Sequence, residues 1–109
     1  MIDARRMEVF TALYDEKLTR IMDPGPMILD SNAFNTELNH NKILFSGSGA
    51  VKMLSFSQNP HILVSNEDHS AADMVTMAWA HYRNREFADL AYSEPFYVKA
   101  FYQAPKKTV

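Results

Sequence analysis

Apolar and aromatic residues gather in short runs separated by polar turn residues along the first part of the chain, and this pattern predicts β-strands. Residues 2–7 read as a short strand and a tight turn, and residues 8–14 as a longer strand rich in Val, Phe, Thr and Tyr. Both faces of the longer strand carry apolar groups, as expected of a strand with a neighbour on each side. Residues 18–22 predict a third, antiparallel strand. We expect Pro24 and Pro26 to end it, because proline has no N–H to donate to a sheet.

The second part of the chain alternates helical patterns with short apolar runs. The apolar runs are bounded by turn residues, which is typical of buried strands. In order, we expect a helix from an N-cap at Asp30 or Ser31 to Leu38, a strand at 42–45, a helix at 50–56 and a strand at 61–64.

The strongest helical pattern begins at Ser70. Asp73 lies three residues on, the spacing of a capping box in which Asp replaces the more favourable Glu. An apolar stripe at helical spacing follows, formed by Ala71, Met74, Val75, Ala78 and Tyr82 and widened by Trp79. We expect this helix to end between residues 85 and 88 and its stripe to join the core. The aromatic-rich segment 92–102 is expected to be extended and packed against the body.

These elements predict an α/β fold: three antiparallel strands, then helix, strand, helix, strand and helix. The same order occurs in a ribonuclease-H-like half-domain, the unit that is duplicated in the actin-like ATPase and sugar kinase folds. The length of 109 residues fits a single domain, 1–109, and the 47% hydrophobic content is enough to fill a core.

Composition narrows the range of functions. The chain has no cysteine, which excludes disulfides, zinc ribbons, iron–sulfur ligation and thiol catalysis. The net charge of −2 provides no basic footprint for nucleic acid. No apolar run approaches the roughly 20 residues that span a bilayer, and the N-terminus has no signal pattern. We therefore expect a cytoplasmic protein without a membrane partner.

The turn formed by Gly47, Ser48 and Gly49 is the candidate small-molecule site. It follows a predicted strand and precedes a predicted helix, where glycines let the backbone approach a phosphate and the helix N-terminus favours an anion. It lacks the third glycine of a dinucleotide motif and the Gly-Lys-Ser/Thr of a P-loop. A plain tight turn is the alternative interpretation.

Two acidic groups also invite a chemical interpretation. Residues 67–69, Glu-Asp-His, together with Asp73 could hold a metal ion. A solvated loop whose acidic residues precede a helix N-terminus explains the same residues. We expect no metal. Asp3 and Glu8 flank the first turn and could act as an acid–base pair. Ion pairing across the turn, with the arginines at 5 and 6 between them, is the commoner arrangement.

No set of nucleophile, base and oxyanion hole is apparent in the sequence, and no serine lies in a Gly-x-Ser-x-Gly elbow. Trp79 and the aromatic residues at 92–102 are expected to pack rather than to stack on bases, because a stacking groove also needs interleaved positive charge. The residues alone therefore predict a domain without catalytic activity and without a cofactor.

Three segments resemble the C-terminal half of the TsaB (YeaZ) family. Residues 2–10, Ile-Asp-Ala-Arg-Arg-Met-Glu-Val-Phe, resemble the family's Ile-Asp-Ala-Arg strand, turn and Glu-Val-Tyr, with Phe10 in place of Tyr. Residues 44–50, Leu-Phe-Ser-Gly-Ser-Gly-Ala, resemble its apolar strand followed by Gly-x-Gly. Residues 93–99, Ser-Glu-Pro-Phe-Tyr-Val-Lys, resemble its closing Glu-Pro-x-Tyr-Leu-Arg/Lys. The three segments occur in the family's order.

This resemblance implies a fold and a role. The family consists of paired ribonuclease-H-like domains of the actin-like ATPase superfamily. It supplies a non-catalytic partner for the synthesis of N6-threonylcarbamoyladenosine at position 37 of tRNAs that read ANN codons. The implied partners are the catalytic paralogue TsaD and the ATPase TsaE, so that tRNA is contacted only indirectly. The label glycoprotease, which the family also carries, finds no support in these residues.

Family members carry an N-terminal domain before the opening hairpin, and we therefore expect this chain to be a fragment. An unpaired half-domain exposes apolar surface, which predicts a homodimer or aggregation. Two other functions stay open. One is the phosphate-binding half of a sugar kinase or ATPase, through the glycine turn. The other is direct tRNA contact through basic residues: Arg5, Arg6, Arg83, Arg85 and Lys106.

Overall fold

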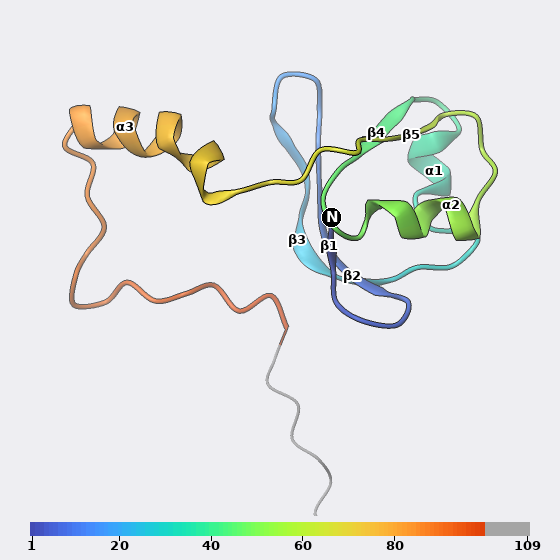
Figure 1. Ribbon diagram of the computed structural model, residues 1–109, viewed down its shortest axis with the longest axis horizontal. Coiled ribbons are helices and arrows are strands. Elements are labelled where there is room, and N and C mark those ends of the chain that lie inside the picture. The colour runs from blue at the N-terminus through green and yellow to red at the C-terminus, as the bar shows by residue number, and fades with distance from the viewer. Residues whose placement is uncertain (100–109) are drawn as a thin grey trace, which may run out of the picture.

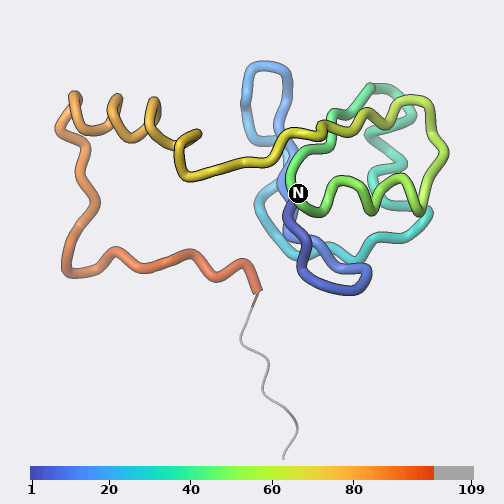
Figure 2. Tube along the Cα trace, in the orientation of Figure 1, coloured from blue at the N-terminus to red at the C-terminus, as the bar shows by residue number. Residues whose placement is uncertain are grey.

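A computed structural model describes residues 1–99, and Figures 1 and 2 show its ribbon and its Cα trace. The first three strands are β1 (Ile2–Asp3), β2 (Glu8–Tyr14) and β3 (Arg20–Ile28). They form an antiparallel sheet in the order β1-β2-β3, so that β2 has a neighbour on each side. The predicted opening of the fold is therefore confirmed.

The third strand is longer than predicted. The expected stop at Pro24 and Pro26 is wrong, because β3 continues through both prolines to Ile28. The N–H of Leu29 donates to the carbonyl oxygen of Met7 on the β2 side. Since successive residues of a regular strand alternate in direction, the nitrogen of Pro26 faces the open edge of the sheet, whereas Pro24 lies at the irregularity between Met22 and Gly25 where the register shifts. No hydrogen bond is lost there, which is why an edge strand tolerates proline.

The middle of the chain forms a second, smaller sheet with helices beside it. Its elements are α1 (Asn35–Leu38), β4 (Ile43–Phe45), the 3₁₀ turn η1 (Ala50–Lys52), α2 (Met53–Phe56) and β5 (Ile62–Val64). The strands β4 and β5 pair in parallel. The two predicted strands and the predicted helix over 50–56 are confirmed to within one residue at each end.

The first helix begins later than predicted. The carboxylate of Asp30 accepts a hydrogen bond from the backbone N–H of Asn32 at 2.8 Å, which closes a turn ahead of the helix. Phe34, in a left-handed conformation with φ 59°, is the residue before α1. Asp30 therefore stabilises the turn and not the helix itself, while the predicted end at Leu38 is correct.

The core lies between the two sheets and the short helices. Its buried apolar residues are Val9, Leu29, Phe34, Leu38, Ile43, Phe45, Ala50 and Met53. The rings of Phe34 and Phe45 meet edge to face, with centroids 5.3 Å apart. Burial is what stabilises these elements, since helices of four residues do not form alone in water.

The C-terminal part of the described chain stands apart from this core. After β5 an extended stretch, 65–69, leads to the 3₁₀ turn η2 (Ala71–Met74) and to α3 (Val75–Arg83), which lie to one side of the body (Figures 1 and 2). The capping box is confirmed: the N–H of Ser70 donates to Asp73 at 2.7 Å, and the hydroxyl of Ser70 accepts from Ala72.

The expectation that the stripe of this helix joins the core is wrong. No residue of η2 or α3 is buried, and Trp79 is 58% exposed. Its ring stacks only on Tyr82 of the same helix, with centroids 5.5 Å apart. The helix ends at Arg83, two residues earlier than expected.

The aromatic side chains of the described part of the tail do not pack against the body as expected, although Lys99 of the same segment contacts Glu8. Tyr92, Phe96 and Tyr97 are at least three-quarters exposed. Residues 100–102 of the predicted segment lie outside the described residues. Helical and aromatic patterns predicted the helix here, but not its place in space.

The described residues thus form an α/β structure in which a three-stranded antiparallel sheet is followed by alternating helices and strands. Within residues 1–99, no helix is long and apolar enough to cross a membrane.

Candidate functional site

The beginning of the chain lies against the glycine turn. The backbone nitrogen of Met1 donates to the carbonyl oxygen of Ser46 at 2.8 Å, and the N–H of Gly49 donates to the carbonyl oxygen of Met1 at 3.2 Å. The N–H of Asp3 donates to the hydroxyl of Ser48 at 3.0 Å. These bonds join the start of β1 to the end of β4, so the two sheets meet at this turn.

The close approach explains both glycines. Gly47 has a φ of 93°, a conformation that side chains rarely adopt, and a Cβ there would collide with the carbonyl oxygen of Met1. A Cβ on Gly49 would lie 2.9 Å from Cγ1 of Val9 and 3.1 Å from the backbone nitrogen of Asp3. Packing therefore requires glycine at both positions, whether or not a ligand binds.

The same contacts bear on the predicted phosphate site at Gly47, Ser48 and Gly49. The amide of Gly49 and the hydroxyl of Ser48 already have partners within the chain. A phosphate at this turn would have to use the remaining donors or displace Met1. Phosphate binding stays a prediction, and its strongest geometric support is the hollow beside the turn.

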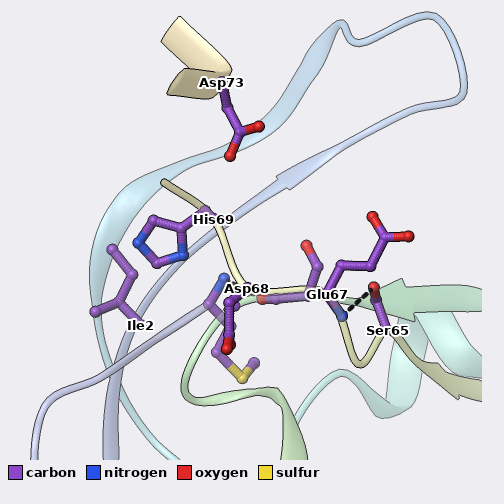
Figure 3. A pocket seen from close by; sticks show the side chains of 9 residues that line it. Ile2, Ser65, Glu67, Asp68, His69 and Asp73 are labelled. Carbon is purple, nitrogen blue, oxygen red and sulfur yellow. Dashed lines mark hydrogen bonds between the residues drawn. The ribbon is translucent and has the colours of Figure 1, made fainter. Parts of the chain in front are cut away.

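This hollow has a volume of about 440 Å³ and opens between the glycine turn and the linker to α3 (Figure 3). Its lining residues are Met1, Ile2, Ser46, Gly47, Ser65, Glu67, Asp68, His69 and Asp73. The fold thus brings together two groups that the sequence presented separately, the glycine turn and the acidic cluster around one histidine. Their positions at the ends of the parallel strands β4 and β5 explain the meeting, because such ends lie at one edge of a sheet.

The acidic side chains do not converge. Figure 3 shows the carboxylates of Glu67 and Asp68 pointing in different directions. The Asp73 carboxylate is engaged by the N–H of Ser70 as part of the capping box. Among the described residues, no group of three or more metal-ligating side chains is placed to hold an ion. The chemistry that this rim offers is therefore negative charge and hydrogen-bond acceptors.

The acids of the first hairpin have distant partners. Asp3 contacts the ammonium of Lys52 at 2.6 Å, and Glu8 contacts that of Lys99 at 2.7 Å. The predicted pairing with Arg5 or Arg6 across the turn is therefore wrong, because both arginines adopt left-handed backbone conformations that form the turn itself.

Lys52 is the residue that the sequence interpretation missed. Besides Asp3, its ammonium donates to the carbonyl oxygens of Arg6 and Glu8, so one side chain fastens the hairpin to the helix after the glycine turn. The hydrogen bond from Lys52, aided by the N–H of Arg5, lowers the pKa of Asp3. A lone lysine in a helical segment carries no signal of this role.

The basic residues suggested for tRNA contact do not form one surface. Arg5 and Arg6 belong to the first hairpin, whereas Arg83 and Arg85 lie at the far end of α3 (Figure 1). The latter two line a second open hollow of about 400 Å³ with Tyr82 and Phe87. Lys106 lies outside the described residues.

Comparisons of the chain with protein-family models, with curated proteins and with solved structures give no match.

Proposed function

We propose that this chain is a non-catalytic partner domain in the synthesis of N6-threonylcarbamoyladenosine at position 37 of tRNA, acting with a TsaD-like catalytic subunit and a TsaE-like ATPase. The proposal rests on the resemblance of residues 2–10, 44–50 and 93–99 to the C-terminal half of the TsaB family. It includes the finer fold, a ribonuclease-H-like half-domain.

The observation that carries the proposal is the contact among those three segments. The hairpin bonds to the glycine turn through Asp3 and Ser48, and the closing segment returns to the hairpin through Lys99 and Glu8. Residues that are more than 90 positions apart in the chain therefore meet in space. Three motifs that share one location are better explained by a common architecture than by chance likeness of short peptides.

The chemistry of the site supports a binding role over a catalytic one. Asp3 and Glu8, the best acid–base candidates, are engaged by lysines, and the rim of the hollow supplies carboxylates that point apart. General acid–base catalysis needs two groups aimed at one reacting atom. The described residues do not present that arrangement around the hollow.

Binding to the catalytic partner tests the proposal. The tagged chain, and separately the longest product of the same gene, are incubated with the TsaD homologue of the same organism and captured. We expect the TsaD homologue to be retained, and we expect the reconstituted system with TsaE to form threonylcarbamoyladenosine on tRNA only when the gene product is present.

A paired substitution sharpens this test. Lys52→Met removes the three hydrogen bonds by which this lysine holds the hairpin, whereas Lys42→Met changes an exposed lysine in the loop before β4 and serves as the control. Retention should fall for the first variant only. If neither the chain nor the longest product retains the TsaD homologue, the proposed function is refuted.

A nucleotide-binding role is the second candidate, because the hollow lies directly beside the glycine turn. Calorimetric titration of the chain with ATP and with ADP separates the two functions. Micromolar binding by the chain alone would favour a kinase-like or ATPase-like half-domain, and its absence together with TsaD retention would favour the partner role.

A further inference from the structure

The end of helix α3 folds back in a tight turn. The N–H of Glu86 donates to the carbonyl oxygen of His81 at 2.9 Å. The N–H of Arg85 donates to the carbonyl oxygen of Tyr82 at 3.1 Å. These two bonds form a Schellman motif, in which the residue after the C-cap is left-handed and is most often glycine. Arg85 occupies that position with a φ of 57°, so the chain carries an arginine where the backbone favours glycine.

The turn gathers three aromatic rings at the end of the helix. Phe87 meets Tyr82 edge to face, with ring centroids 6.0 Å apart, and Tyr82 stacks on Trp79 at 5.5 Å. The ring of His81 contacts the carboxylate of Glu86 at 2.7 Å, which fastens the turn to the helix. We call Trp79, Tyr82 and Phe87 the aromatic cluster. Its position is fixed by local bonds, although it is not packed on the body.

Two guanidinium groups lie beside the aromatic cluster. They line the open hollow of about 400 Å³, whose lining residues are Tyr82, Arg83, Arg85 and Phe87. Among residues 1–99, no carboxylate lies within ion-pair distance of either guanidinium. The carboxylate of Glu86 contacts His81, and that of Asp89 accepts from the N–H groups of two later residues. The hollow therefore combines exposed rings with positive charge that no carboxylate neutralises.

This combination is what a single-stranded nucleic acid requires. Bases stack on aromatic rings with little preference for sequence, and positive charge among the rings engages the phosphates. We did not expect the rings of α3 to stack on bases, because the sequence showed no such charge among them. The Schellman turn supplies it, since it brings Arg85 and Phe87 to the hollow that Tyr82 lines.

We propose that this hollow binds single-stranded nucleic acid, with a base on the aromatic cluster and phosphates at Arg83 and Arg85. A pocket for a free nucleotide encloses most of its ligand, whereas Tyr82 and Phe87 stay 60% and 68% exposed. A strand suits so open a surface, because neighbouring nucleotides add contacts. The net charge of −2 opposes a polyanion, so we expect weak binding that depends strongly on salt.

Trp79 provides the first test, because it is the single tryptophan of the chain and belongs to the aromatic cluster. The whole chain is titrated with an oligoadenylate of about eight nucleotides, and the tryptophan emission is followed at several salt concentrations. We expect quenching as bases stack. The logarithm of the association constant should fall with the logarithm of salt with a slope of about −1.4, the value for two phosphate contacts to a single strand.

Arg85→Gly separates binding from folding. It removes one positive charge but supplies the residue that the left-handed position prefers, so the helix end keeps or gains stability. The affinity should nevertheless fall, and the salt slope should drop to about −0.7. Arg20→Gln is the matched control, because it removes the same charge from an exposed position on β3, in the other sheet. We expect it to leave the slope unchanged.

Tyr82→Leu tests the stacking. It removes the central ring of the aromatic cluster and should weaken binding about fivefold or more. Tyr97→Leu is the control, since Tyr97 is 78% exposed and does not line the hollow. Circular dichroism verifies that both variants retain their helix content.

Four outcomes would overturn the proposal. They are the absence of quenching at every concentration, a salt slope near zero, equal losses for Arg85→Gly and Arg20→Gln, and unchanged affinity in Tyr82→Leu. Competition by AMP that matches the oligoadenylate would also overturn it, because the site would then be one for a free nucleotide. The proposal is independent of the role in tRNA modification, and retention of a TsaD homologue decides that role separately.

Discussion

The body of the molecule, residues 1–64, and the segment from residue 70 to 99 are both rich in apolar side chains but differ completely in burial. All eight buried apolar residues belong to the body. In η2 and α3 none is buried, and Leu90 further on is fully exposed. An apolar pattern therefore shows that a segment can be amphipathic, whereas burial depends on whether another surface reaches it.

The difference also predicts where the molecule opens first. Hydrogen bonds hold distant segments of the body together. They include the one from the nitrogen of Met1 to the carbonyl oxygen of Ser46 and the three that Lys52 donates to the first hairpin. Helix α3 has its capping box and contacts among its own rings. In segments with few buried contacts, local opening costs little free energy, so the backbone amides there exchange their hydrogens with water early. In a dilute monomer we expect the amides of α3 to exchange before those of β2.

The largest expected contrast is between core and helix truncations. Leu38→Ala removes a fully buried side chain and should lower the free energy of unfolding by about 2–5 kcal/mol. Val75→Ala, on the exposed helix, should change it by less than about 0.5 kcal/mol in dilute solution. Urea denaturation followed by circular dichroism measures both. Equal losses would contradict the division into a packed body and an unpacked segment.

The glycine turn gives the next contrast within the body. Gly49→Ala places a methyl group 2.9 Å from Val9 and should destabilise the chain by about 1–3 kcal/mol through overpacking. Gly25→Ala is the control, because the added methyl group would lie 3.9 Å from the carbonyl oxygen of Asp23, an ordinary contact distance. Thermal unfolding of the two variants compares them. A stable Gly49→Ala variant would mean that β1 does not approach the turn as closely as described.

The capping box tests the segment alone. Ser70→Ala removes the hydroxyl that accepts from Ala72 and should cost the helix about 0.5–2 kcal/mol. Because α3 is not packed on the body, this loss should appear in the exchange of α3 amides and leave the urea midpoint of the body unchanged. Ser55→Ala, in the exposed part of α2, is the control. A shift of both regions together would show that they are coupled.

The smallest expected effect is a dependence of stability on pH. The pKa of Asp3 is lowered in the folded chain by Lys52, so its contribution is present above the unfolded value of 3.8 and is lost as pH falls through the lower folded pKa. Because this carboxyl is exposed, the change is small. Asp3→Asn should flatten the stability profile below about pH 4, as measured by urea titration at each pH. An unchanged profile would argue against the pair.

Much of the body could be predicted from local patterns. The β-branched and aromatic composition located β2, short apolar runs located β4 and β5, and the spacing of Ser70 and Asp73 located a helix start through a capping box. The end of β3 could not be predicted in this way. Pro24 and Pro26 break a central strand but not an edge strand, and only the strand order decides which of the two β3 is.

The candidate site was predictable only in parts. The glycine turn and the acidic residues at 67–73 stood out in the sequence, but their common hollow exists because β4 and β5 are parallel neighbours. The partners of Asp3 and Glu8 were predicted incorrectly because the fold, and not the local sequence, brings them together. Lys52 and Lys99 are distant in sequence, and local spacing favoured the nearby arginines.

The sequence by itself determined the order and type of the elements, because turn chemistry, capping and apolar period act between residues close in the chain. Tertiary structure alone decided why Gly47 and Gly49 must be glycine, which lysines hold the first hairpin, and that the stripe of α3 is uncovered. Those outcomes depend on which surfaces meet, and burial and close contact are properties of pairs of segments rather than of one.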